Sequence, residues 1–178
     1  FDYNLSGEYS GASILDISAY FKLSDDYVLR GSFMNASYYP SLVSMYYRSS
    51  YENFNWKNDF SRINATRLSV SFESPKILDA RLDFTTIDNY VYYDSLRIPR
   101  QYGERIDVLA LTLHRDLRYK AFGWDNTFTY QNVSSGSSVM PLPEVMLRST
   151  LYAHFPMFKR AMTLRPTLTL KYYSAFKA

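Results

Sequence analysis

The sequence predicts an all-β fold, namely an antiparallel transmembrane β-barrel built as an up-and-down meander. Three observations indicate this fold. Hydrophobicity alternates with a period of two residues, the alternating segments are unusually long, and short turns alternate with longer polar loops along the chain. We expect residues 1–178 to form one domain, with about nine strands of a larger barrel visible.

The alternation is clear where Leu15, Ile17, Ala19, Phe21 and Leu23 are interleaved with Asp16, Ser18, Tyr20 and Lys22. Successive side chains of an extended strand point to opposite faces, so this segment has one dry and one wet side. Similar patterns begin at Leu78, Leu109, Phe122 and Met162.

The alternating segments run roughly 9–13 residues, whereas strands of soluble sheets usually run about 5–6. At about 3.3 Å per residue and a tilt near 40°, ten residues climb about 25 Å, the height of the apolar band of an outer-membrane barrel. The composition agrees, since 18 Tyr, 12 Phe and 2 Trp suit strands and membrane interfaces. A soluble β-sandwich remains the alternative fold.

Turn signals divide the chain into strands joined alternately by short turns and long loops. Short turns are expected at 24–26, 74–76, 117–120 and 156–159, and longer loops at 39–53, 94–103 and 133–143. Residues 54–72 keep their apolar side chains at even positions without a slip, which predicts one long strand. The predicted strands are 2–9, 13–23, 27–38, 54–74, 78–92, 105–116, 121–132, 144–155 and 160–173. Because bacterial single-chain barrels have an even number of strands, we expect nine to be part of a longer barrel.

The charged side chains of the predicted wet face are the candidate lumen-lining residues. Charges in a pore wall filter solutes, while the alternative is that they form ion-pair ladders that brace the wall. The candidates comprise seven basic and six acidic residues: Asp16, Lys22, Arg30, Arg67, Glu73, Asp79, Arg81, Asp83, Asp125, Glu144, Arg148, Arg165 and Lys171.

Two similar aromatic repeats, one beginning at Phe54 and the other at Phe122, predict girdles at the membrane interface. A platform on which sugars stack is the alternative for these rings. The predicted girdle residues are Phe54, Trp56, Phe60, Phe122, Trp124, Phe128 and Tyr130.

Other classes of site have little support in the sequence. The net charge of +3 is spread along the chain, which argues against nucleic acid as a partner, and the absence of Cys excludes thiolate metal sites. His114 and His154 are lone histidines without a catalytic motif, so we expect no catalytic residues, no metal, no cofactor and no enzymatic activity. An enzyme would need one of them within hydrogen-bond reach of a carboxylate.

Several segments resemble the putative porin family of Bacteroidetes-type outer membranes. The similar segments are Tyr46–Ser50 followed by Phe54–Phe60, then Thr86–Asp94, Pro141–Glu144, Arg148–Tyr152 and Phe158–Ala161. They agree with the family in order and spacing over residues 46–176. The resemblance implies the C-terminal portion of a large single-chain barrel. Asp94-Ser95-Leu96 also resembles a short acceptor motif for O-linked glycans, which leaves glycosylation of Ser95 open.

Together these features predict a porin or channel for small hydrophilic solutes in a bacterial outer membrane, with a polar, charged lumen. Its partners would be the lipid bilayer and lipopolysaccharide, and other outer-membrane proteins are a further candidate. The alternative is a non-conducting structural barrel subunit that anchors a larger secretion or nutrient-uptake complex. In that case Tyr46, Tyr47 and Tyr51, which do not follow the alternation, would contact the partner.

Overall fold

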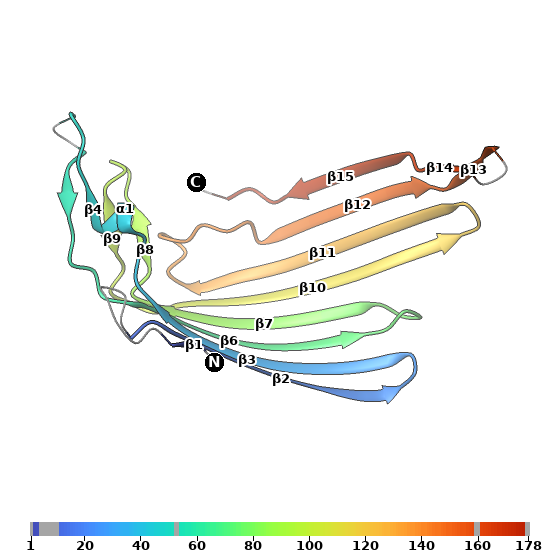
Figure 1. Cartoon of the computed structure of the whole chain (residues 1–178), viewed down its shortest axis with the longest axis horizontal. Coiled ribbons are helices and arrows are strands. Elements are labelled where there is room, and N and C mark those ends of the chain that lie inside the picture. Colours follow the sequence, from blue (N-terminus) through green and yellow to red (C-terminus); the bar gives the residue numbers. More distant parts are fainter. Residues whose placement is uncertain (1, 4–10, 52–53, 159–160, 177–178) are drawn as a thin grey trace.

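The computed structural model describes residues 2–3, 11–51, 54–158 and 161–176. Its main feature is one nine-stranded antiparallel sheet, in which each strand pairs with the strand of the same sheet that follows it in the sequence (Figure 1). Its strands, in order, are β1 (Asp2–Tyr3), β2 (Ser13–Ser24), β3 (Tyr27–Tyr38), β6 (Ile63–Glu73), β7 (Asp79–Asp88), β10 (Ile106–Tyr119), β11 (Phe122–Ser135), β12 (Val145–Ala153) and β15 (Thr167–Tyr173).

The predicted meander is confirmed, and so is the alternation of connections. At one end of the sheet lie the turns that join β2 to β3, β6 to β7 and β10 to β11. At the other end lie the longer segments 39–62, 89–105 and 136–144. The sheet is open, because in the described part of the chain β1 pairs only with β2 and β15 only with β12. The closed barrel therefore stays a prediction.

The long segments carry small elements of their own beyond the end of the sheet (Figure 1). A short helix α1 (Leu42–Met45) leads into β4 (Tyr46–Tyr47), which pairs with β5 (Trp56–Lys57). A second hairpin pairs β8 (Val91–Tyr93) with β9 (Pro99–Gln101). At the opposite end, β13 (Phe155–Met157) pairs with β14 (Met162–Leu164) between β12 and β15. No helix of the described residues is long and apolar enough to cross a membrane.

The prediction of one strand over 54–74 is wrong. Residues 58–62 form no strand, and β6 begins at Ile63. The reason is that the earlier half is bound to α1. Trp56 donates its Nε1–H to the Val43 carbonyl at 2.9 Å, and the backbone N–H of Asn58 donates to the Met45 carbonyl at 2.7 Å. The apolar side chains do occupy even positions without a break, but this pattern does not show which segment of the chain their backbone pairs with.

Other predicted boundaries also shift. The strand expected over 78–92 ends at Asp88, because Asn89 takes a φ of 60° and β8 leaves the sheet. The strand expected over 105–116 continues to Tyr119, so the turn lies at 120–121 instead of 117–120. The strands expected over 144–155 and 160–173 are each divided by the β13–β14 hairpin. The first predicted strand, 2–9, lies mostly outside the described residues.

Candidate functional site: the charged face of the sheet

The strand register sorts the side chains onto two very different faces. Residues paired across neighbouring strands share a face, so Ile17, Phe33 and Leu68 lie together, as do Lys22, Val28 and Glu73. The first face, here called the apolar face, is continuous from β2 to β15 and strongly exposed. Ten of its apolar residues have exposed fractions between 43% and 72%. They are Ile17, Phe21, Leu68, Val70, Leu82, Phe84, Leu109, Leu151, Leu168 and Leu170.

The opposite face, here called the charged face, carries the predicted lumen-lining residues. Eleven of the thirteen lie in strands, and the register puts all eleven on this face: Asp16, Lys22, Arg30, Arg67, Glu73, Asp79, Arg81, Asp83, Asp125, Arg148 and Lys171. The other two, Glu144 and Arg165, lie just before β12 and β15. The structure thus gathers these residues on one surface, and their role in lining a pore stays a prediction.

Several of these charges are paired with one another, either across neighbouring strands or along one strand. The Arg30 Nε lies 3.7 Å from a carboxylate oxygen of Glu73 on the neighbouring strand. Asp83 forms an ion pair with Arg81 at 2.9 Å and accepts a hydrogen bond from Ser69. The alternative reading, ladders that brace the wall, therefore has a geometric basis for these pairs.

The largest charged cluster is centred on His114 of β10. Its Nδ1 lies 3.2 Å from Asp79 of β7, and its Nε2 lies 2.9 Å from Asp125 of β11. Arg148 of β12 in turn donates to the second oxygen of Asp125 at 3.3 Å. The cluster therefore crosses four neighbouring strands, and the carboxylates of Asp79 and Asp125 alternate with His114 and Arg148. A histidine can donate a hydrogen bond to each of two carboxylates only when both of its ring nitrogens carry a proton.

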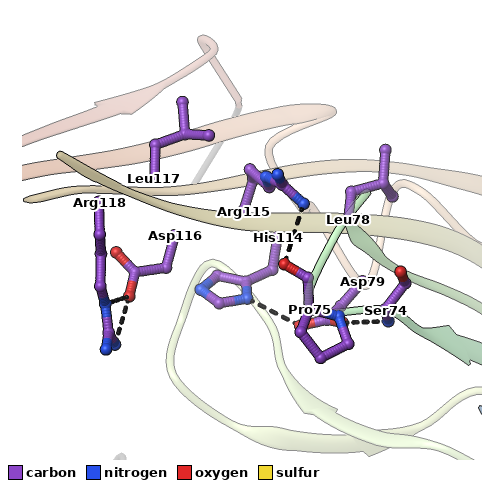
Figure 2. A pocket seen from close by; sticks show the side chains of 9 residues that line it. All are labelled: Ser74, Pro75, Leu78, Asp79, His114, Arg115, Asp116, Leu117 and Arg118. Atoms are coloured by element: carbon purple, nitrogen blue, oxygen red, sulfur yellow. Dashed lines mark hydrogen bonds and ion pairs between the residues drawn. The ribbon is translucent and has the colours of Figure 1, made fainter. Parts of the chain in front are cut away.

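This cluster borders a cavity of about 520 Å³ at the end of the sheet with the short turns. Figure 2 shows its lining side chains, with His114 turned toward Asp79 and Arg118 beside Asp116. The turn next to the cavity is linked to its neighbour by an ion pair between Lys76 and Asp26. The hydrogen bond that the Lys76 ammonium group donates to Asp26, together with the charge of that carboxylate, raises the pKa of Lys76.

A second cluster joins Asp116, Arg118 and Tyr152, which the sequence analysis did not single out. The Tyr152 hydroxyl donates to Asp116 at 2.8 Å and accepts from the Arg118 Nε at 3.1 Å. The guanidinium of Arg165 lies 4.4 Å from the centre of the Tyr152 ring. The ring itself lies across Gly123 of the adjacent strand, where a Cβ would overlap the ring atoms. A sequence signal existed, since Asp116 and Arg118 continue the even positions of β10, but the predicted turn at 117–120 concealed it.

The two histidines have different surroundings. His114 meets the condition of a nearby carboxylate, and both of its ring nitrogens face carboxylates. The ring of His154 packs edge-on against Tyr152 at 5.5 Å. Among the described residues, no three His, Asp or Glu side chains are placed to hold a metal ion.

The predicted girdle residues fall in two separate places. Phe122, Trp124, Phe128 and Tyr130 lie on the apolar face of β11, and their role as a girdle stays a prediction. Phe54, Trp56 and Phe60, in contrast, lie outside the nine-stranded sheet, with Trp56 stacked on Tyr47 at 5.0 Å. The two similar repeats therefore occupy different environments.

Comparison with known proteins agrees with the two-faced sheet. No curated protein matches the chain. A family model described as "Putative porin" matches residues 1–178, the whole of the sequence. Porins carry an apolar surface and a polar one on opposite faces of a sheet, as this chain does. The chain therefore belongs to the Putative porin family.

Proposed function

We propose that the chain forms part of the wall of an outer-membrane channel for small hydrophilic solutes, with the apolar face in contact with lipid and the charged face lining the lumen. The observation that carries this proposal is the exposed apolar face. A soluble monomer rarely exposes a contiguous apolar patch of more than a few hundred Å². Here such side chains extend over eight strands.

The dimensions of the apolar face suit a membrane. On β2 it runs from Leu15 to Leu23. Eight steps of about 3.3 Å give about 26 Å along the strand, or about 20 Å of height at a tilt near 40°, which is comparable with the band of about 25 Å in outer-membrane barrels. Trp124 and Phe122 stand at one end of this face, where interfacial aromatic residues are expected.

The location of the lipid can be tested with the two tryptophans of the sequence, which lie in different places. The Trp56→Phe variant leaves Trp124 on the apolar face as the reporter, and Trp124→Phe leaves Trp56 outside the sheet. In vesicles of brominated phospholipids we expect strong quenching of Trp124 and little quenching of Trp56. Equal quenching of the two would contradict the proposed orientation of the sheet.

The channel is tested by single-channel conductance in planar bilayers, where a closed, non-conducting barrel would refute it. Arg67 offers a charge test, because it lies on the charged face and forms no ion pair with the described residues. Arg67→Glu should shift the reversal potential in a salt gradient toward cation selectivity. Arg97→Glu, in the β8–β9 turn, changes the charge equally away from the sheet and is the control.

The open sheet supports a larger barrel. Closure requires partners for β1 and β15, and the resemblance to Bacteroidetes-type members suggests that the chain is the C-terminal portion of such a barrel. Cysteines placed on β15 and on a candidate neighbouring strand should form a disulfide in the folded protein. Cross-linking between β15 and β1 instead would mean that the nine strands close on themselves.

A second candidate function is a structural barrel subunit in a larger outer-membrane assembly. A polar row crosses the otherwise apolar face, because Arg115, Asn126 and Ser149 are paired in register. Ser149 donates to the Asn126 side chain at 2.8 Å and accepts from Trp124 at 2.7 Å. Such a row suits contact with another protein. Copurification of a stoichiometric partner in detergent, lost in the Asn126→Leu variant, would favour this candidate.

A further inference from the structure

The segment around β4 and β5 forms an aromatic cavity outside the sheet, here called the loop cavity. Its volume is about 460 Å³, and the residues that line it are Tyr46, Tyr47, Arg48, Ser49, Asn55, Trp56 and Lys57. This volume lies within the usual range for small-molecule sites, about 300–1,000 Å³. Figure 1 shows that α1 and β4 of this segment lie beyond the end of the sheet that carries the long loops.

The aromatic rings are held in place without any ligand. The Tyr47 and Trp56 rings stack at 5.0 Å, and Phe54 packs edge-on against Trp56 at 6.5 Å. The indole N–H of Trp56 is turned inward and donates to the Val43 carbonyl at 2.9 Å. Since Trp56 uses its only polar group internally, it presents an apolar ring surface to the cavity.

The backbone around the rings is fixed as well. The Asn58 side chain donates to the Ser44 carbonyl at 2.9 Å, and Ser44 is 2% exposed. On the other side of the cavity, Asn55 accepts from the Ser49 amide at 2.8 Å and donates to the Tyr51 carbonyl at 2.9 Å. A pre-organised site loses little conformational entropy when a ligand binds.

Two tyrosine rings remain far more exposed than packing requires. Tyr46 is 54% exposed, and Tyr47 is 40% exposed although its ring stacks on Trp56. A tyrosine offers an apolar ring face and a hydroxyl at its edge. A saccharide has the matching character, because its C–H groups pack on ring faces while its hydroxyls form hydrogen bonds.

The charge of the loop cavity narrows the ligand further. Arg48 and Lys57 line it, and no acidic side chain among the described residues does. A guanidinium binds a carboxylate or sulfate group through paired hydrogen bonds. We propose that the loop cavity binds an acidic saccharide, with its sugar ring on the Tyr47–Trp56 stack and its anionic group at Arg48. The ligands of this class have in common a sugar ring that carries a carboxylate or a sulfate group.

The binding test uses the full chain with Trp124→Phe, so that Trp56 is the only tryptophan of the 178 residues and reports on the cavity. Trigalacturonate is titrated against the folded protein in detergent, and we expect a saturable change in Trp56 emission. Its methyl ester, which keeps the rings but removes the charges, should bind at least fivefold more weakly. A sulfated trisaccharide distinguishes carboxylate from sulfate as the preferred group.

Matched variants separate the cavity from the rest of the loop surface. Tyr47→Ala and Arg48→Gln should each weaken binding of trigalacturonate at least tenfold. Tyr93→Ala and Arg97→Gln remove another exposed aromatic ring and another exposed guanidinium from the neighbouring hairpin, and should change affinity less than twofold. Circular dichroism of each variant shows that the strands are retained.

Three results would overturn the proposal. These are the absence of saturable binding in the folded protein, equal binding of the charged and esterified trisaccharides, and tighter binding of a nucleotide such as AMP, which also carries a stacking ring and an anion. Binding is read from fluorescence and not from conductance. A protein that binds the acidic saccharide but conducts no ions would refute only the channel, and the reverse result would refute only the saccharide site.

Discussion

Adding a single methyl group to Gly123 should destabilise the sheet, because the ring of Tyr152 occupies the space beside it. Gly123 and Tyr152 are paired in register on β11 and β12. A Cβ on Gly123 would overlap the Cζ, Cε2 and hydroxyl oxygen of that ring. Tyr152 is only 6% exposed, so it has little room to move aside. If it moves, its hydroxyl leaves Asp116 and Arg118.

The expected loss of stability follows from the overpacking at Gly123 and from the lost hydrogen bonds of the Tyr152 hydroxyl. Overpacking a well-filled site costs about 1–3 kcal/mol. A hydrogen bond to a charged group contributes about 1.5–3 kcal/mol, less where water can replace it. Because the ring can give way partly, the two losses do not add in full. We expect Gly123→Ala to lower the free energy of unfolding by about 2–4 kcal/mol.

The control is Gly31→Ala on β3, since a Cβ there meets no atom within 4 Å. It should be neutral, or stabilising by up to about 1 kcal/mol through the unfolded chain. Urea unfolding in phospholipid vesicles, followed by tryptophan fluorescence, measures both variants. A double-mutant cycle with Tyr152→Ala isolates the contact. If Gly123→Ala lowers the free energy of unfolding equally with and without the Tyr152 ring, the contact between the two residues is not the cause of the loss.

Two further predictions concern charged groups. His114→Gln leaves Asp79 and Asp125 without a donor that reaches both, and should cost about 1–2 kcal/mol in the same urea assay, at the lower end because the three side chains are 24% to 46% exposed. His154→Gln is the control, and equal losses in the two variants would contradict the bridging role. In the β8–β9 hairpin, the backbone N–H of Ile98 chiefly, with help from Arg100 and Leu96, holds the pKa of Asp94 below its ordinary value of 3.8. Because the folded pKa is the lower one, Asp94 stabilises the turn above pH 3.8 and this stabilisation is lost as the pH falls through the folded pKa. Amide chemical shifts of Ile98 should follow this titration, and their persistence in Asp94→Ala would show that another group titrates.

Most of the sheet could be predicted because its signal is local. Alternation assigns Leu15 and Asp16 to opposite faces whatever their neighbours are, and the same holds along the other strands. In a meander each strand pairs with the next one, so the order of strands in the chain is also their order in space. For this reason the eleven strand residues predicted for the charged face all lie on it, although His114, Asp116 and Arg118 of β10 were not among them.

The segments that leave the sheet could not be predicted in the same way. Residues 54–60 alternate like a strand, yet Trp56 and Asn58 bind the carbonyl groups of Val43 and Ser44, which lie more than ten positions earlier. Hydrophobic period alone does not distinguish a strand of the wall from a strand of a loop hairpin. The ends of β7 and β10 were missed for a related reason, since a single residue such as Asn89 at positive φ redirects the chain.

By itself, the sequence determined the strand class, the order of the strands and the two faces, because each depends on the period-two pattern and on short connections. Only the tertiary structure decided which charges meet. His114 lies between Asp79 and Asp125, residues 35 positions before it and 11 positions after it, and Tyr152 reaches Asp116 across Gly123. Pairing across strands depends on register to within one residue, and register is set by the hydrophobic pattern of the strands together with the geometry of the turns that join them.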